Sequence, residues 1–426
     1  MMHKVIFALL ASSKDVSSSD RSLHTPAQGW ARLIIAAYGP TLLASIGFGA
    51  VIPLIALQAT ALGASVGLAA AITGLTGIAT LLFDLPAGVV AERLGEKRAI
   101  MLACLVDTAL MVLIWTFPNL WVLAAVVFVH GMTLSIFGLA RQKYLTESLP
   151  LKYRARGMSS LGGVFRIGFF LGPLVGAALV HDGDLGRAFL FAGVMSLVAA
   201  GVTALLPDLP SDKAIDVNKP RPHTLSVLRR HWRVLATVGI GCLGMMFIRS
   251  ARQTIIPLWS QAHGLAPSQT SLIYSMSMAM DVLLFFPGGA LMDRFGRWWV
   301  CVPSAFVMSI GLLVLPLTHD AWTITAVACL LGLGNGVSSG IVMTLGADSS
   351  PRIGRTQFLA SWRLLSDSGN ALGPVVISAV TAIVSLGWAA VVVGVLGLGF
   401  GAWLSHWVPR RPEDIVNLMP AEDRVS

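Results

Sequence analysis

The longest charge-free stretch of the sequence restricts the fold more than any other feature. No Asp, Glu, Lys or Arg occurs between Arg32 and Asp84. A helix needs about 20 apolar residues to cross about 30 Å of hydrocarbon, so this stretch is too long for one crossing and fits two. Charged residues make up only 12% of the 426 residues, about half the share found in soluble domains. The sequence therefore predicts a polytopic membrane protein.

Further apolar runs bring the number of predicted spans to twelve. They lie at 99–117, 120–140, 158–180, 188–206, 234–259, 270–291, 299–318, 321–346, 358–382 and 385–408. The expected fold class is an all-α membrane protein with twelve transmembrane helices in two pseudo-symmetric six-helix bundles. The predicted order is an N-terminal tail (1–32), a bundle (33–207), a central linker (208–233), a second bundle (234–408) and a C-terminal tail (409–426).

The placement of basic residues predicts the orientation in the membrane. Lys and Arg concentrate in both tails, in the even-numbered loops and in the central linker, and only Arg187 lies in a predicted outside loop. By the positive-inside rule, both termini are expected in the cytoplasm. The expected location is the cell membrane, here a bacterial cytoplasmic membrane. The net charge of +9 is thereby explained without a nucleic-acid partner.

The two halves of the chain repeat each other at a constant offset of 201 residues. The clearest repeat reads Pro86-Ala-Gly88-x-x-x-Glu92-Arg93-Leu-Gly95 in the first half and Pro287-Gly-Gly289-x-x-x-Asp293-Arg294-Phe-Gly296 in the second. Further pairs at the same offset are Gly131 with Gly332, Glu147 with Asp348, Pro150 with Pro351 and Arg154 with Arg355. A six-span unit repeated in the same orientation is a transporter architecture.

The repeated motif resembles the loop between spans two and three of the major facilitator superfamily. Its hallmark is a Gly, an acid, an Arg, a Gly and then basic residues. The matching positions are Gly88, Glu92, Arg93, Gly95, Lys97 and Arg98, and in the second half Gly289, Asp293, Arg294, Gly296 and Arg297. The resemblance implies a transporter that works by alternating access on small molecules, without a cofactor and without enzymatic activity. We expect it to act as a monomer in the lipid bilayer.

The resemblance also predicts which buried charges meet. In this superfamily span two packs on span eleven, and span five packs on span eight. Depths counted at about 1.5 Å per residue then predict Asp84 and Glu92 near Arg363, and Arg166 near Asp281. The contact of Glu92 with Arg363 is interpreted as a gate latch that closes the inward side, with a proton-carrying role as the alternative.

A second motif lies in span five and reads Gly168-Phe-Phe-Leu-Gly172-Pro173-Leu-Val-Gly176. It is similar to the motif of the twelve-span drug:proton antiporters, which implies export. A tightly packed, kinked helix is the structural alternative, and a near-copy, Gly369-x-x-x-Gly373-Pro374, occurs in span eleven. The Arg that these antiporters usually carry in span four is missing, because Val127 stands where it is expected.

Charged residues inside spans are the candidates for coupling and binding, because each is expensive in lipid unless it is paired or faces a water-filled cavity. The candidates for proton coupling are Asp281, Asp367, Asp84, His130 and Arg166. A fixed ion pair or a hydrogen-bonded core His is the structural alternative, and Asp107 is expected to be structural. The candidates for a substrate cavity are Tyr38, His130, Arg249, Arg252 and Asn335. Arg249 and Arg252, three residues apart on one face of span seven, are expected either to attract an anionic group of a substrate or to pair with Asp281. Such a cavity would not favour a permanent cation.

The function predicted from these features is proton-coupled export of small amphiphilic organic compounds. An uptake permease or symporter of the same superfamily is the alternative, because fold does not fix direction. A polytopic membrane enzyme is a remote second alternative. The sequence has no nucleotide loop and no metal-ligand cluster, and its four cysteines all lie in apolar runs, so neither a metal nor a disulfide framework is expected.

Overall fold

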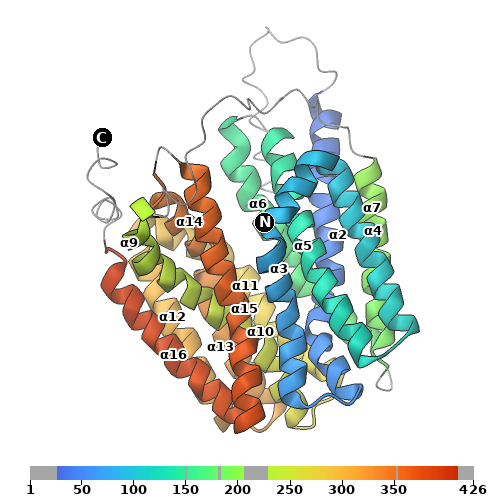
Figure 1. Cartoon of the computed structure of the whole chain (residues 1–426), viewed down its shortest axis with the longest axis vertical. Helices are drawn as coiled ribbons and strands as arrows, with labels where there is room; N and C mark the ends of the chain where they lie inside the picture. Colours follow the sequence, from blue (N-terminus) through green and yellow to red (C-terminus); the bar gives the residue numbers. More distant parts are fainter. Residues whose placement is uncertain (1–25, 149–150, 181–183, 206–228, 352–353, 411–426) are drawn as a thin grey trace.

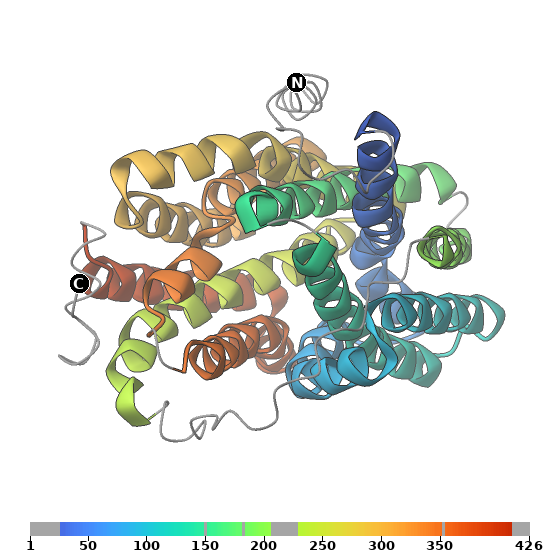
Figure 2. The same cartoon turned by 90° about the horizontal axis from the view of Figure 1, so that it is seen from above.

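The described residues form twelve helical passes in two bundles that lie side by side (Figures 1 and 2). In the computed structural model these residues are 26–148, 151–180, 184–205, 229–351 and 354–410. The first bundle consists of α2 (Pro26–Ala61), α3 (Val66–Leu94), α4 (Glu96–Thr116), α5 (Leu120–Ser148), α6 (Leu151–Leu179) and α7 (Gly186–Ala204). The second consists of α9 (Trp232–Val234) with η2 (Leu235–Gly239) and α10 (Ile240–Ala262), α11 (Pro267–Phe295), α12 (Trp298–Val314) with η3 (Leu315–Leu317), α13 (Ala321–Val337) with α14 (Ile341–Asp348), α15 (Arg355–Ile383) and α16 (Leu386–Trp407).

The expected fold class is confirmed. Within the described ranges, eleven passes are long and apolar enough to cross a membrane. The twelfth, α15, is 29 residues long and carries Arg363 and Asp367 within it. The first helix begins at Pro26, before the predicted start of the first bundle. The remainder of the two predicted tails (1–25 and 411–426) and most of the predicted linker (206–228) lie outside the described residues.

The sequence repeat corresponds to a repeat of backbone conformation. The two bundles share a near end, where α2 begins and α16 ends. At the opposite, far end, α2 connects to α3 and α10 connects to α11. Gly63 and Gly264 turn the chain at the far end with φ angles of 91° and 74°. Gly95 and Gly296 end α3 and α11 at the near end with φ angles of 79° and 97°. Residues with a side chain rarely adopt these backbone angles, which explains why the hallmark motif needs its last Gly in both halves.

The two bundles touch most closely towards the far end. Thr60 and Gln261 hydrogen-bond to each other there through their side chains, with Gln261 Nε2 2.7 Å from Thr60 Oγ1. Along the seam between α3 and α15, small residues bring the backbones together: a Cβ at Gly77 would lie 3.0 Å from the Cα of Ala371. Along the seam between α6 and α11, Ser275 donates a hydrogen bond of 2.8 Å to the carbonyl of Phe170.

At the near end the hallmark glycines have no such contacts. Gly88 on α3 and Gly289 on α11 would each meet nothing within 4 Å if they carried a Cβ. The helices that pack closely along the seams have therefore separated where these glycines lie. This is the arrangement of a two-bundle protein closed at its far end and open at its near end.

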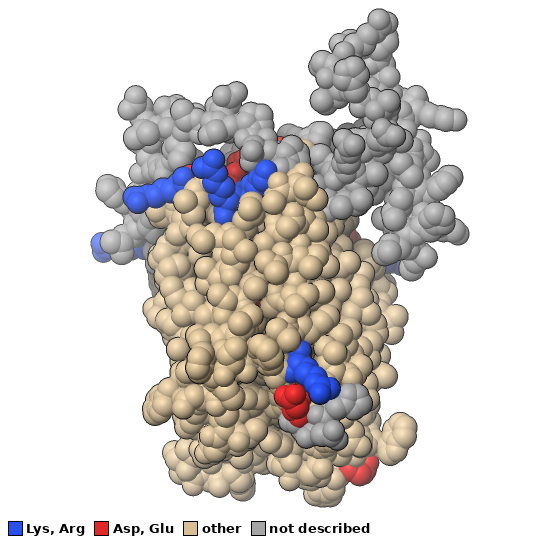
Figure 3. Space-filling model, turned by 90° about the vertical axis from the view of Figure 1, so that its right-hand side faces the viewer, with Lys and Arg blue, Asp and Glu red and all other residues tan. Residues whose placement is uncertain are grey.

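Charge on the outside follows the same axis. Figure 3 shows Lys and Arg gathered along the upper, near end of one face, above a body that is almost free of charge. At the far end, the exposed Asp320 precedes α13 and accepts hydrogen bonds from the backbone N–H groups of Trp322 (2.9 Å) and Thr323 (3.0 Å). The bonds from Thr323 lower the pKa of Asp320, as expected for a carboxylate that caps a helix.

We predict that Gly95→Ala and Gly296→Ala each destabilise the protein by about 1–3 kcal/mol, because Ala is strained at these φ angles. Gly88→Ala is the matched control in the same motif, since its Cβ would point into open space within a helix. Thermal unfolding of the purified variants measures the difference. Equal melting temperatures for Gly95→Ala and Gly88→Ala would contradict the explanation.

Candidate functional site

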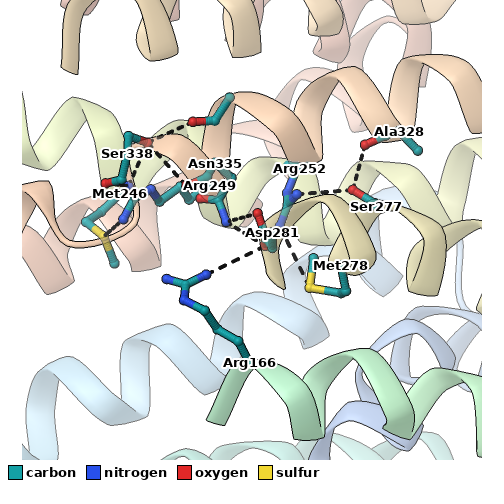
Figure 4. A network of polar contacts seen from close by, with 11 residues as sticks. Arg166, Met246, Arg249, Arg252, Ser277, Met278, Asp281, Ala328, Asn335 and Ser338 are labelled. Atoms are coloured by element: carbon teal, nitrogen blue, oxygen red, sulfur yellow. Dashed lines mark hydrogen bonds and ion pairs between the residues drawn. The ribbon is translucent and has the colours of Figure 1, made fainter. Parts of the chain in front are cut away.

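Asp281 is the centre of a buried polar network near the middle of the second bundle (Figure 4). It lies on α11 and is 3% exposed. Asn335 of α13 donates through Nδ2 to both carboxylate oxygens, at 2.9 and 2.7 Å. Arg252 of α10 donates through Nη2 to Oδ2 at 3.1 Å. Three helices are thus joined by one carboxylate, whose oxygens face donors only.

Arg252 is held on its other side as well. Its Nη1 donates to Ser277 Oγ at 3.1 Å, and that hydroxyl donates in turn to the carbonyl of Ala328 at 2.6 Å. The side chain is 1% exposed. Arg252 is therefore a fixed partner of Asp281, which is one of the two roles predicted for it.

Arg166 approaches the same carboxylate from the other bundle. It lies on α6, and its Nη1 is 3.9 Å from Asp281 Oδ2. Its guanidinium lies over the ring of Phe285, 5.0 Å from the centroid. The predicted contact of Arg166 with Asp281 is thus present, as a loose ion pair that crosses the seam. The Arg166 side chain remains 21% exposed.

Arg249 lies one turn before Arg252 on α10 and faces the interruption between α13 and α14 in the tenth pass. Its Nη2 donates to the carbonyl of Ser338 at 2.6 Å and to the Ser338 hydroxyl at 2.9 Å. Ser338 directly follows the last residue of α13, Val337, and caps the helix. Among the described residues no carboxylate forms an ion pair with Arg249. The network thus holds three guanidinium groups and one carboxylate, a formal excess of two positive charges.

A second charged cluster has the opposite balance. On the seam between α3 and α15, Arg363 Nε lies 2.9 Å from Asp84 Oδ2 and 3.5 Å from Asp367 Oδ2. The predicted contact of Asp84 with Arg363 is present. Two carboxylates therefore share one guanidinium, which leaves one negative charge in excess.

A third cluster lies inside the first bundle. His130 Nδ1 is 2.5 Å from Asp107 Oδ1, and Ser196 donates to Asp107 Oδ2 at 2.6 Å. All three are buried, and the ring of Phe48 meets the His130 ring edge-on at 4.9 Å. The contacts fit the structural interpretation of both Asp107 and His130, which tie α4, α5 and α7 together.

Other predicted residues lie apart from the central network. Tyr38 donates a hydrogen bond of 3.2 Å to the carbonyl of Gly157 near the start of α6. His130 belongs to the cluster in the first bundle. Of the predicted cavity residues, the structure brings together only Arg249, Arg252 and Asn335. Sequence reasoning missed Ser277 and Ser338; for Ser338, the signal was the run of Gly, Asn and Ser residues that interrupts the tenth pass.

The hallmark motif makes a different set of contacts from the one predicted. Among the described residues Glu92 forms no ion pair with Arg363, because the near ends of α3 and α15 have separated. Instead, each half has an ion pair next to the motif that links the start of its third pass to the end of its fourth. These pairs are Lys143 with Glu96 and Arg297 with Asp348, the latter at 2.8 Å. For Arg93, Arg98 and Asp293 no ion pair is seen in the described ranges, and Arg294 lies over the ring of Phe295.

The Gly-Pro motif of α6 is a packing surface. A Cβ at Gly168 would lie 2.4 Å from Ser45 Cβ, and one at Gly172 would lie 2.5 Å from the carbonyl of Ile46, both on α2. Gly176 meets the next turn of α2 in the same way. In the second half, Gly369 and Gly373 of α15 pack equally closely on α10. Both copies therefore bring two helices of one bundle together.

Within the described ranges no cluster of three or more His, Cys, Asp or Glu residues has suitable geometry to hold a metal ion.

Comparison with known proteins identifies the family of this architecture. The family described as Major Facilitator Superfamily matches residues 40–374 and 238–425. An uncharacterised MFS-type transporter of Methanocaldococcus jannaschii is 22% identical over 319 residues, which are 73% of this chain and 81% of that protein. The uncharacterised MFS-type transporter YcaD of Escherichia fergusonii is 25% identical over 55% of this chain and 59% of its own length, less than two thirds of it. A solved structure, that of a D-xylose-proton symporter, superposes with a TM-score of 0.72 at 14% identity, covering 89% of this chain and 98% of the symporter.

We predict that Asp281→Ala lowers the free energy of unfolding by about 3–5 kcal/mol, because it leaves Arg252 buried without a counter-charge. Asp184→Ala is the matched control, since Asp184 forms an exposed ion pair with Arg187 at the start of α7 and such pairs contribute about 0–1 kcal/mol. Thermal unfolding in detergent compares the two variants. A loss for Asp281→Ala no larger than that for Asp184→Ala would show that the network does not stabilise the fold.

Proposed function

Because the chain belongs to the major facilitator superfamily, whose members are secondary transporters and not enzymes, we propose that it is a proton-coupled exporter of small amphiphilic organic compounds. It works by alternating access, as a monomer in the bacterial cytoplasmic membrane, with both termini in the cytoplasm. In this orientation the near end is the cytoplasmic end, where basic residues gather in Figure 3, in agreement with the positive-inside rule.

The seams support alternating access. The far end is closed by the side-chain hydrogen bond of Thr60 with Gln261, and the near end is open around Gly88 and Gly289. In the proposed orientation this is an inward-facing state. The opposite state would form by rocking the bundles until α3 meets α15 at Gly88 and α11 meets α6 at Gly289, where the absence of side chains permits close approach.

Proton coupling rests on one observation: Asp84 and Asp367 share Arg363 at the seam. Arg363 balances one carboxylate, and the second is left in a largely buried place where an unpaired charge is costly. A proton on either carboxyl group removes the excess charge. Because the cluster joins α3 of one bundle to α15 of the other, the gain or loss of that proton acts directly on the contact that must change during alternating access.

Asp281 is a weaker candidate for the proton. Its oxygens accept three hydrogen bonds, two from Asn335 and one from Arg252, and Arg166 lies 3.9 Å away. All these groups stabilise the ionised carboxylate. We therefore assign Asp281 a structural role and place the coupling proton on Asp84 and Asp367.

The proposed direction of transport, export, rests on the similarity of residues 168–176 to the motif of the drug:proton antiporters. Uptake is the second candidate. The copy of this motif in α15 packs on α10 in the same way, so the packing of the motif does not distinguish export from uptake.

We predict that the pH dependence of the conformational equilibrium disappears in Asp367→Asn. In a background without the native cysteines, Thr60→Cys with Gln261→Cys reports the closed far end through cross-linking, because the two side chains are in hydrogen-bonding contact. Cross-link yield should change with pH when Asp84 and Asp367 are both present. Asn at 367 imitates the protonated carboxyl group, so the yield should stay at the value that the unmodified cluster shows in acid.

Asp184→Asn serves as the control, because this exposed carboxylate should leave the pH profile unchanged. A profile in Asp367→Asn like that of the parent would contradict the assignment. Proteoliposomes then test coupling directly: a pH gradient should drive solute movement in the parent and not in Asp367→Asn. Inside-out and right-side-out vesicles distinguish export from uptake.

A further inference from the structure

The excess of positive charge in the central network calls for a partner that the described chain does not supply. Asp281 is engaged by Arg252 and Asn335, and it lies too far from Arg166 for a hydrogen bond. Arg166 and Arg249 thus carry two charges near the middle of their helices, without a carboxylate in hydrogen-bonding contact. Such charges are rare inside a membrane unless a ligand or water compensates them.

Arg166 has the more available guanidinium. Within the described part of the chain it donates no hydrogen bond, although a guanidinium has five N–H groups. Its position over Phe285 orients the group without using those donors. With 21% of the side chain exposed, its free N–H groups can be reached by a small molecule.

Arg249 presents a second guanidinium from the other bundle. It is partly exposed, and its Nε has no hydrogen-bond partner. Figure 4 shows Arg166 extending from α6 towards the helices that carry Arg249 and Asp281. One anionic group can thus be approached by a guanidinium from each half of the protein.

Apolar atoms border these cations. The sulfur of Met246 lies 3.9 Å from Arg249 Nη1, and Phe285 lies beneath Arg166. Methionine and aromatic side chains adapt to apolar bodies of varied shape. The site therefore combines charges for an anionic head with soft apolar contacts for the remainder of a ligand.

We propose that the transported compounds are small organic anions, bound between Arg166 and Arg249. This inference rests on the proposed transport function for the anion to be cargo; the binding itself does not depend on proton coupling. An anion at this place hydrogen-bonds to both bundles, so it stabilises the two states of alternating access to different extents. Arg166 then has two competing partners, the ligand and Asp281.

A purely structural role for the same residues makes a different prediction. Arg249 would serve only to bond the carbonyl at the end of α13, and Arg166 only to pair with Asp281. Anions would then bind no better than neutral compounds of the same shape, and the variants would change stability alone.

Binding to purified protein in detergent tests the proposal with matched probes: benzoate, benzamide and benzylamine, and the corresponding naphthalene carboxylate, carboxamide and methylamine. We expect saturable binding of the anionic member of at least one set, and about ten-fold weaker binding of that anion to Arg166→Gln and to Arg249→Gln, since one charge-assisted hydrogen bond is lost in each. Arg166→Lys should restore part of the affinity.

Arg187→Gln controls for the general loss of a positive charge, because Arg187 lies exposed in the first turn of α7. Melting temperatures without ligand show whether each variant is folded, and Arg166→Lys covers the case in which Arg166→Gln is not. Equal binding of anion and amide, or unchanged binding to the Gln variants, would overturn the proposal. Anion binding to the parent protein is measured without a pH gradient, so its absence is distinguished from a failure of proton coupling, which the cross-linking assay tests separately.

Discussion

Charges that sit on lipid-crossing helices must find their partners inside the protein, and this requirement organises the whole structure. Asp281 joins α10, α11 and α13 through Arg252 and Asn335. Asp107 joins α4, α5 and α7 through His130 and Ser196. Asp84 joins the two bundles through Arg363. The first two clusters are balanced by fixed donors and hold a bundle together, whereas the charges that are not balanced lie at or near the seams, where the bundles must move.

The duplication has preserved backbone geometry more strictly than charge. Gly95 and Gly296 keep the same unusual φ angles, because no other residue adopts them without strain. Arg166, by contrast, occupies the repeat position of Asp367, and Glu96 that of Arg297. The central network therefore has an excess of positive charge, whereas the cluster on the seam between α3 and α15 has an excess of negative charge, and each of the two contains residues of both halves.

The sequence predicted the spans and the repeat, since these follow from apolar length and a constant offset. The ion pairs of Arg166 with Asp281 and of Asp84 with Arg363 were predicted by combining the helix pairs that the family resemblance implies with depths counted from helix ends. Helix rotation is not available from such counting. For this reason His130 was left open between a cavity residue and a hydrogen-bonded core His, and the contact with Asp107 fits the second interpretation. Glu92 was placed near Arg363 because the counting assumes that the near ends touch, and the separation of α3 from α15 depends on conformational state.

The hydrogen bond of Thr60 with Gln261 also bears on the history of the protein. The two residues occupy the same position of the repeated unit, so their contact lies on the axis that relates the halves. In a dimer of two identical six-helix chains, a residue on the two-fold axis would meet its own copy, and no single substitution could make the pair unlike. Fusion of two gene copies removes that restriction. In a fused chain, the short hydroxyl side chain of Thr60 and the long amide side chain of Gln261 can pair across the axis, which is impossible for two identical chains.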